Sequence, residues 1–194
     1  MNLDRIPNRT LLATLGLGLL AGLVSCTTAP EAPLTAERLE PYSCGDVQRI
    51  HTLGGVFLAS QPGPEDLKHA SEGGIKTVVT LRQDDEIDWD EKATVEALGM
   101  EFHSLPFKAP GELSDAVLDE VRGLLRDESK RPLLLHCSSA NRAGAVWLAH
   151  RVLDGGLAFE AAEAEATTVG LKLPAYSERV REYVAARSAA PSTN

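Results

Sequence analysis

The residues of this chain with the clearest chemical potential lie in one short segment, HCSSANR at positions 136–142. The apolar run 132–135 before it predicts a buried strand, and the stretch AVWLAHRVL at 145–153 predicts a helix. A polar loop between a strand and a helix N-terminus directs backbone N–H groups toward one point and so favours an anion. Arg142 can add a planar, two-donor clamp. The same field favours the thiolate of Cys137, so we expect a nucleophile beside an oxyanion cradle.

Two residues of this segment are therefore the predicted catalytic pair, Cys137 and Arg142. The backbone of the loop should matter more to anion binding than its side chains, although its hydroxyls or amide could also contribute a hydrogen bond. The predicted anion-binding residues are Ser138, Ser139, Ala140, Asn141 and Arg142.

The segment also carries a family resemblance. A His-Cys pair, a short loop, Arg, a small residue and Gly resemble the signature of cysteine-dependent protein tyrosine and dual-specificity phosphatases. The order Ser60-Gln61-Pro62, Leu81-Arg82 and His136-Cys137 is similar to a bacterial phosphatase-like family, related to the part fused to beta-lactamase-like hydrolases. The resemblance covers residues 45–185 and implies a phosphatase-like fold and phosphoester hydrolysis through a phosphocysteine.

The sequence departs from the phosphatase pattern at three places. Four residues separate Cys137 from Arg142 where the family usually has five, and this shorter loop also resembles that of rhodaneses. Ala143 stands where the family has Ser or Thr, and the stretch 106–111 lacks the family's general-acid Asp. Two alternatives to a phosphatase therefore stay open: a rhodanese-like sulfurtransferase that forms a Cys137 persulfide, and a non-catalytic phosphate-binding module.

Several further residues have two interpretations. Glu112, or one carboxylate of the acidic run around Trp89, could donate the missing proton, although most of that run reads as a solvated loop and helix start. The acidic run comprises Asp84, Asp85, Glu86, Asp88, Asp90 and Glu91. Arg82 either faces the site or forms a structural ion pair, and His136 is expected to be structural. The histidines show no metal-ligand spacing, so we expect no metal and no cofactor.

The N-terminus predicts the location of this chemistry. Residues 1–25 combine a short charged region with the apolar run 11–24, which is shorter than the roughly 20 residues that span a bilayer. Leu23-Val24-Ser25-Cys26 resembles a lipoprotein signal, in which Cys26 is lipidated, and the following Thr resembles outer-membrane sorting. A secretory signal or an uncleaved anchor is the alternative. We expect a periplasmic, lipid-anchored protein with a tether at 26–40 and a domain at 41–190.

Charge limits the possible partners. After loss of residues 1–25, the chain keeps 27 acidic and 17 basic residues, a formal charge of −10. This balance argues against nucleic acid and against electrostatic adhesion to anionic lipid. The expected partner is a phosphorylated protein or small molecule, the expected membrane contact is the lipid on Cys26, and the expected state is a monomer.

Two cysteines remain besides Cys26 in what would be an oxidising compartment. Cys44 is either a small buried residue or the disulfide partner of Cys137, and the sequence does not supply the sulfur separation that decides between them.

The apolar patterns predict an α/β fold in which a mainly parallel central sheet is flanked by helices. Predicted strands are 47–50, 55–60, 76–81, 101–106 and 133–136, and predicted helices are 64–72, 89–98, one capped by Ser114, 142–153, 158–169 and 175–187. Trp147 and Leu148 should be core residues of the helix after the loop. Such sheets bind ligands at the carboxyl ends of their strands, which is where Cys137 falls.

Overall fold

The structure is a computed structural model and describes residues 37–188. The predicted signal segment, Cys26 and most of the predicted tether lie outside the described residues. Within residues 37–188, no helix combines the length and the apolar character needed to cross a bilayer.

A six-stranded sheet forms the middle of the domain, in the order β1-β2-β3-β6-β4-β5. The strands β3, β6, β4 and β5 run parallel to one another, whereas β1 and β2 are antiparallel additions at one edge. This arrangement confirms the predicted mainly parallel sheet. The strands are β1 (Glu40–Pro41), β2 (Ile50–Leu53), β3 (Val56–Ala59), β4 (Thr77–Thr80), β5 (Glu101–Ser104) and β6 (Leu133–His136).

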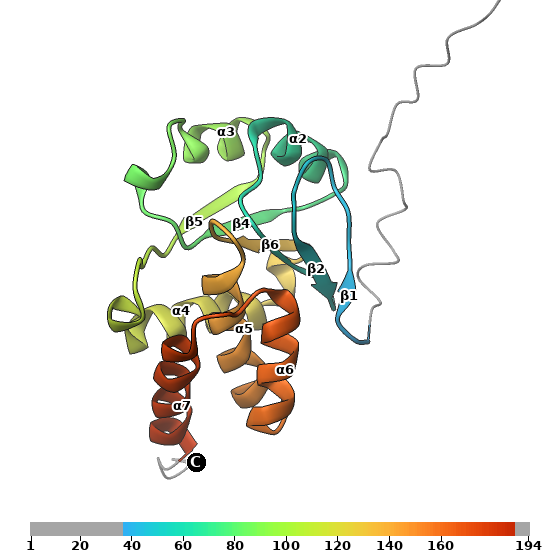
Figure 1. Ribbon diagram of the computed structural model, residues 1–194. Coiled ribbons are helices and arrows are strands. Elements are labelled where there is room, and N and C mark those ends of the chain that lie inside the picture. Colours follow the sequence, from blue (N-terminus) through green and yellow to red (C-terminus); the bar gives the residue numbers. More distant parts are fainter. Residues whose placement is uncertain (1–36, 189–194) are drawn as a thin grey trace, which may run out of the picture.

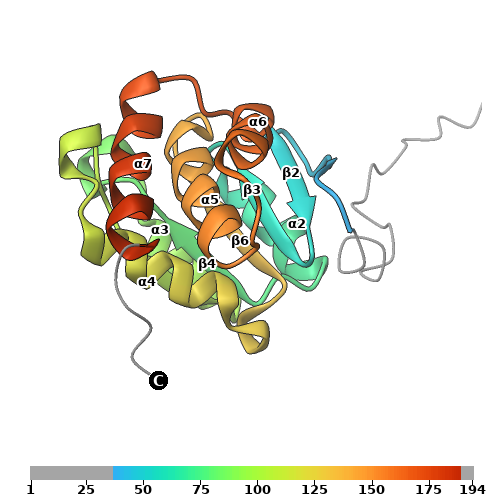
Figure 2. The same cartoon turned by 90° about the horizontal axis from the view of Figure 1, so that it is seen from below.

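Helices cover both faces of the sheet (Figure 1), as the sequence predicted. One face carries α2 (Pro64–Glu72) and α3 (Glu91–Ala97). The other carries α4 (Asp115–Arg126), α5 (Asn141–Leu153), α6 (Phe159–Val169) and α7 (Pro174–Ser188), with α5 in the middle of this layer (Figure 2). Three short 3-10 helices, η1 (Asp84–Glu86), η2 (Pro110–Glu112) and η3 (Glu128–Lys130), lie in the connections.

The first hairpin differs from its prediction. We expected a strand at 47–50, but β2 occupies Ile50–Leu53 and pairs with β3 from Ile50↔Ala59 to Leu53↔Val56. The cause is the two-residue turn, because Gly54 and Gly55 both have positive φ, at 56° and 80°. Such a turn joins strands directly at its ends, so the residues immediately before Gly54 must pair. Val47 instead belongs to a turn in which its N–H donates to the Cys44 carbonyl at 3.2 Å.

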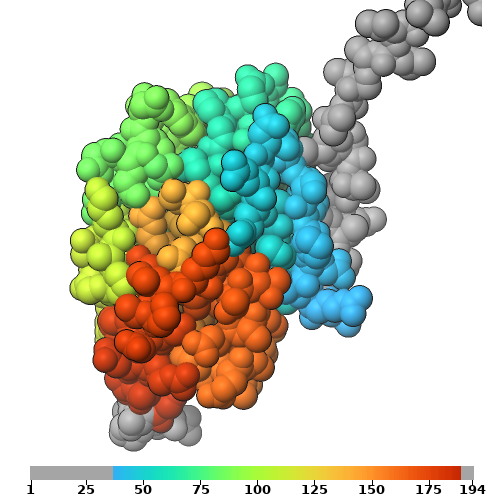
Figure 3. Space-filling model, viewed as in Figure 1, coloured from blue at the N-terminus to red at the C-terminus, as the bar shows by residue number. Residues whose placement is uncertain are grey.

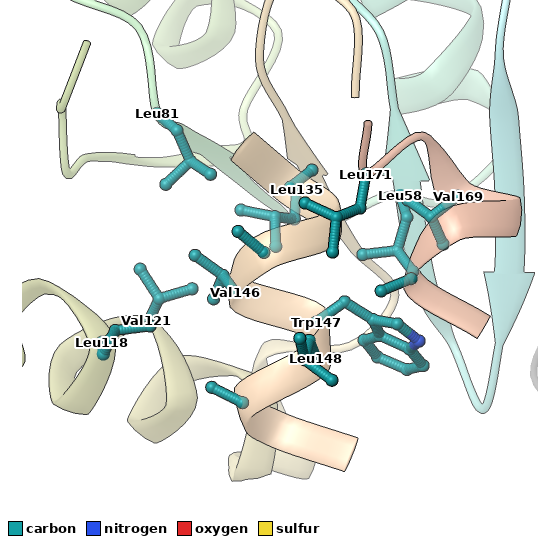
Figure 4. Packing of buried hydrophobic residues seen from close by; sticks show 14 of the residues in the cluster. Leu58, Leu81, Leu118, Val121, Leu135, Val146, Trp147, Leu148, Val169 and Leu171 are labelled. Atoms are coloured by element: carbon teal, nitrogen blue, oxygen red, sulfur yellow. The ribbon is translucent and has the colours of Figure 1, made fainter. Parts of the chain in front are cut away.

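Two apolar clusters fill the space between the sheet and its helices. The larger cluster lies on the side of α4–α7 and includes Ala143 and residues 145–149 of α5, a helix that is buried from residue 142 to residue 150. Trp147 and Leu148 are 1% and 0% exposed, so their prediction as core residues is confirmed; Figure 4 shows them with Val146 on α5. A helix enclosed in this way has its position fixed by packing. The loop at its N-terminus is fixed with it.

Gly144 permits the close approach of α5 to the α6–α7 connection. A Cβ atom on Gly144 would lie 2.9 Å from the Ala166 carbonyl oxygen and 2.9 Å from the Leu171 nitrogen. Both neighbours are backbone atoms, which cannot rotate away. Any larger residue at position 144 would therefore force one of these backbone segments to shift.

This close contact gives a test of the packing around α5. Gly144→Ala should lower the free energy of unfolding by about 1–3 kcal/mol, because the new methyl group overlaps backbone atoms. Gly123→Ala is the matched control on α4, where a Cβ would meet nothing within 4 Å. The control should raise the free energy of unfolding by roughly 0.5–1 kcal/mol through helix propensity alone. Urea unfolding measures both, and effects of the same sign would refute the assigned contact.

Candidate active site

The segment singled out in the sequence lies at the carboxyl end of β6, where the parallel strands end. Cys137 follows this strand directly and is 1% exposed, whereas Ser138 and Ser139 are exposed above it. In the space-filling view, this loop and the start of α5 occupy the middle of one face (Figure 3). The loops after β3, β4 and β5 and the α6–α7 connection surround them. This position is the one expected for a ligand site in a parallel sheet.

The loop backbone is held from two sides. On the β3 side, the Gln61 N–H donates to the Ser138 carbonyl at 3.3 Å, and Ser60 forms an isolated antiparallel bridge with Ser139. On the helical side, Asn141 Oδ1 accepts from the Lys172 N–H at 2.8 Å. The Asn141 side chain, predicted as part of the anion site, thus fastens the α6–α7 connection to the start of α5.

Ala140 makes the sharp turn from the loop into α5. Its φ of 66° is the only positive φ of a non-glycine residue in the part of the chain that the structure describes. It is also the N-cap of α5, and no side chain caps the helix there. An uncapped first turn leaves backbone N–H groups and the positive end of the helix dipole for an anion.

Arg142 extends from the first turn of α5 and is 7% exposed. Its Nη1 donates to Glu86 Oε2 at 2.8 Å, to the Leu81 carbonyl at 2.9 Å and to the Phe107 carbonyl at 2.9 Å. Its Nη2 donates to Glu86 Oε1 at 2.8 Å. Glu86 therefore grips one edge of the guanidinium. The other edge, made by Nε–H and the second Nη2–H, remains for a second planar contact.

Electrostatics supports this arrangement. Hydrogen bonding to Arg142 lowers the pKa of Glu86 to about 2, even though partial burial opposes the charge. Burial disfavours the charge of Arg142, but its hydrogen bonds to Glu86 and its contact with Cys137 raise its pKa overall. Glu86 and Arg142 thus form a pair that is charged at neutral pH, and the guanidinium also contacts the Cys137 sulfur.

The three motifs behind the family resemblance meet in one hydrogen-bonded network beside this pair. The Arg82 Nη1 donates to Gln61 Oε1 at 2.6 Å, and its Nη2 donates to the backbone carbonyl of Glu86. Gln61 Nε2 in turn donates to Glu91 Oε1 at 2.8 Å. Arg82 accordingly braces the segment that carries Glu86. This role differs from both sequence interpretations, because its hydrogen bonds go to an amide and a carbonyl.

His136 and Glu91 form the buried end of this network, on the α3 side of the sheet. His136 Nε2 lies 3.2 Å from Glu91 Oε1, and the two side chains are 0% and 3% exposed. Burial would raise the pKa of Glu91, but contacts with His136, Gln61 and Thr80 lower it overall. His136 is thus directed away from the anion cradle, which agrees with its predicted structural role.

The loop after β5 closes the opposite rim of the site. Glu112 Oε2 accepts from the Lys108 N–H at 2.7 Å, which folds the carboxylate back onto this loop. Tyr176, on α7, donates its hydroxyl to the Lys108 carbonyl at 3.2 Å. Burial raises the pKa of Tyr176 to about 12, with Arg142, Cys137, Glu112 and Glu86 close enough to act on it. The sequence analysis missed Tyr176, and its helical apolar spacing gave no sign of a site position.

Cys44 and Cys137 are not joined to each other, so the alternative of a disulfide between them is wrong. The sheet separates them. Cys44 lies beside Ile50 and Phe57 on the α2 side, whereas Cys137 belongs to the apolar cluster on the α5 side. The other interpretation is confirmed, because Cys44 is buried, at 7% exposure. Among residues 37–188, no three His, Cys, Asp or Glu side chains are grouped to hold a metal ion.

Comparison with known proteins agrees with this geometry. No family model matches the chain. The dual specificity protein phosphatase TpbA of Pseudomonas aeruginosa is 27% identical over 150 residues, which cover 75% of this chain and 64% of TpbA. The match thus spans slightly less than two thirds of the relative.

Solved structures share the fold. A cysteine-to-serine variant of P. aeruginosa TpbA in complex with phosphotyrosine has a TM-score of 0.61 at 21% identity, covering 77% of this chain and 96% of that one. Tk-PTP in its active form has a TM-score of 0.58 at 23% identity, covering 67% and 91%. The chain therefore has the fold of these phosphatases and is similar in sequence to TpbA. For this phosphatase-like chain, the finer relation to the part fused to beta-lactamase-like hydrolases stays a prediction.

The Glu86–Arg142 pair predicts a particular pH dependence of stability. The pKa of Glu86 is about 2 in the folded protein against an ordinary 4.5. Its contribution to stability is therefore complete above about pH 4.5 and is lost as the pH falls toward 2. In Glu86→Gln this contribution is absent, so the free energy of unfolding should fall less steeply between pH 5 and pH 3 than in the wild type.

Urea unfolding at several pH values measures this slope. Asp88→Asn is the matched control, since Asp88 is an exposed carboxylate two residues further along the same loop. The control should keep the wild-type slope. If Glu86→Gln also kept that slope, the pair would not have the strength assigned to it.

Proposed function

We propose that this protein is a cysteine-dependent phosphatase that hydrolyses phosphomonoesters. The observation that carries the proposal is the orientation of Arg142. Glu86 occupies one edge of its guanidinium, and the other edge is left beside Cys137. A planar guanidinium and an uncapped helix N-terminus beside a thiol suit the transfer of a phosphoryl group to the sulfur, because both bind the phosphoryl oxygens.

In the proposed reaction, the Cys137 thiolate attacks phosphorus in line with the ester oxygen. A sulfur–phosphorus bond forms as the phosphorus–oxygen bond breaks, and the leaving oxygen takes up a proton. Arg142 and the N–H groups of the loop hold the equatorial phosphoryl oxygens, whose contacts strengthen in the transition state. Water then attacks the phosphocysteine, which releases phosphate and restores the thiolate.

Glu112 is the proton donor in this proposal. It lies on the rim formed by the loop after β5, and its charge acts on Tyr176 together with those of Cys137 and Arg142. Its Oε2 accepts from the Lys108 N–H, so the proton to be donated would sit on Oε1. The same carboxyl group, as the anion, then activates the water of the second step.

The short loop enters α5 through Ala140, whose backbone is left-handed. Its left-handed conformation costs a non-glycine residue about 1–2 kcal/mol, and such conformations persist where the surroundings hold them for a functional reason. Substrates with a single phosphate on an aromatic carrier fit the proposal, since TpbA is known in complex with phosphotyrosine.

One side-by-side assay tests the chemistry. Residues 27–194, under reducing conditions, should hydrolyse p-nitrophenyl phosphate and should not convert thiosulfate and cyanide to thiocyanate. Cys137→Ser should abolish turnover, and Arg142→Lys should lose most of it because the planar fork is lost. Glu112→Gln should slow phenyl phosphate more than p-nitrophenyl phosphate, whose better leaving group needs less protonation.

The other outcomes of this assay favour the other functions. Thiocyanate formation that depends on Cys137 would show a sulfurtransferase. Vanadate binding without either activity would show a phosphate-binding module. Undiminished p-nitrophenyl phosphate hydrolysis by Cys137→Ser would eliminate Cys137 as the nucleophile. Circular dichroism establishes that each variant is folded.

We also propose that the domain is tethered to the bacterial envelope, facing the periplasm, through a lipid on Cys26. The support is the sequence Leu23-Val24-Ser25-Cys26, which lies outside the described residues. Full-length protein expressed in a Gram-negative host should incorporate labelled palmitate, and Cys26→Ala should incorporate none. Equal labelling of the two proteins would contradict a lipid on this residue.

A further inference from the structure

A second polar pocket lies at the opposite end of α5 from Cys137. We call it the α5-end pocket; the residues of its lining that matter here are Arg126, Arg131, Trp147, His150, Arg151 and Asp154. The α5 helix has 13 residues, and each residue advances a helix by about 1.5 Å. Roughly 18 Å therefore separate the two ends, so this pocket is not part of the candidate active site.

The lining is cationic, although the protein carries a formal charge of −9. Its three arginines face one carboxylate, Asp154, which is already shared among several basic groups. Asp154 accepts from Arg122 at 2.8 and 2.7 Å and from Arg126 at 3.0 Å. Burial opposes its charge, but these bonds lower the pKa of Asp154 to about 2. One carboxylate therefore leaves an excess of positive charge in the pocket.

Arg131 is the residue that most clearly requires a further partner. Its Nη2 donates to the Leu125 carbonyl at 2.7 Å, and no carboxylate in residues 37–188 forms a salt bridge with it. Its Nε is buried and has no hydrogen-bond acceptor among the described residues. A buried charged donor without an acceptor costs more than a neutral one, which costs about 1–3 kcal/mol. The Arg131 guanidinium lines the pocket, where an oxyanion would give it the anionic partner that it lacks.

Arg151 and His150 also contribute to the electrostatics of the pocket. Arg151 donates to Glu165 at 2.7 and 3.1 Å, and Glu165 is not among the residues that line the pocket. Burial lowers the pKa of His150 against the attraction of Asp154, and the charges of Arg131 and Arg151 lower it further. His150 is consequently neutral at pH 7. Its ring adds a polar group without removing the excess of arginine charge.

The remaining wall is apolar and aromatic. Trp147 lines the pocket with Leu53 and Val56, and the Arg151 guanidinium lies 5.5 Å from the Trp147 ring centre. Figure 4 shows the Trp147 ring extending from α5 beside the β3 residue Leu58. A ligand for these surroundings combines an oxyanion, which meets the guanidinium groups, with a compact apolar or aromatic body.

We propose that the α5-end pocket binds a small aromatic or apolar oxyanion, a carboxylate or a phosphoryl group, at Arg131. Both anions share the planar or tetrahedral oxygens that a guanidinium fork recognises. The site is independent of the proposed phosphatase activity, because it uses no residue of the Cys137 loop.

Trp147 itself can report the binding. The chain has two tryptophans, so Trp89→Phe leaves Trp147 as the only tryptophan emitter. Titration of this variant with benzoate and, separately, with phenylphosphonate should change the Trp147 emission to saturation. The probe that binds more tightly identifies carboxylate or phosphoryl as the preferred anion. Saturating vanadate, which occupies the Cys137 loop, should leave the titration unchanged.

Substitutions of arginine locate the site. Arg131→Gln in the Trp89→Phe background should raise the dissociation constant at least about tenfold, as expected for loss of a charge-assisted hydrogen bond. Arg181→Gln is the matched control, because Arg181 lies on α7 above Phe159 and does not line the pocket. The control should bind as the parent does.

Arg126→Gln is a second pocket variant, which keeps the test valid if Arg131→Gln does not fold. Arg126 is 52% exposed, so its replacement disturbs little packing, and it should also weaken binding. If neither probe changed the Trp147 emission, or if both pocket variants bound as tightly as Arg181→Gln, the proposal would be wrong. These outcomes leave p-nitrophenyl phosphate hydrolysis unaffected, so failure of this site and failure of the phosphatase proposal are distinguishable.

Discussion

The buried ion pair between Glu86 and Arg142 is the interaction on which the rest of the site depends. The two side chains are 14% and 8% exposed, and they meet through two hydrogen bonds of 2.8 Å. Removing two charges from water carries a penalty of several kcal/mol per ion, so such a pair is not retained for stability alone. Its effect here is geometric, since a guanidinium held along one edge presents its other edge in a fixed direction.

The surrounding structure serves to bring these two residues together. Arg142 is placed by α5, whose position follows from packing on all sides and from the missing side chain at Gly144. Glu86 belongs to η1. The Arg82 side chain donates to the backbone carbonyl of Glu86, and it also donates to the side-chain oxygen of Gln61. The strand ends that supply Gln61 and Arg82 lie on either side of β6 in the sheet. Sheet order thus converts three motifs that are far apart in sequence into one support for the anion site.

The sequence was sufficient for the fold class, most elements and the location of the site. The helix Pro64–Glu72 and the strand Leu133–His136 match their predictions, because a proline, glycines and a run of leucines define them locally. The predicted position of β2 was wrong, since it depends on how a glycine pair turns and not on the apolar pattern before it. The acidic run around Trp89 looked like a uniform solvated loop. Yet Glu86 and Glu91 are drawn into the interior by partners about 50 residues away.

These misses share a physical cause. Periodicity reports which face of an element is buried, whereas ion pairs such as Glu86–Arg142 depend on where two separate connections meet in space. The same limit applies to Tyr176, whose position above the loop depends on how α7 packs. The cationic pocket at the far end of α5 had no sequence signal either, because its arginines come from three segments that only the fold assembles.

A structure with a bound oxyanion tests the central claim most directly. Crystals of residues 27–194 soaked with tungstate, a tetrahedral analogue of phosphate, should hold the anion next to Cys137 Sγ. The account predicts hydrogen bonds from Arg142 Nε and Nη2 and from the loop N–H groups, with Glu86 still on the opposite edge of the guanidinium. If Arg142 left Glu86 to bind tungstate, or if the anion bound away from Cys137, the account would be contradicted.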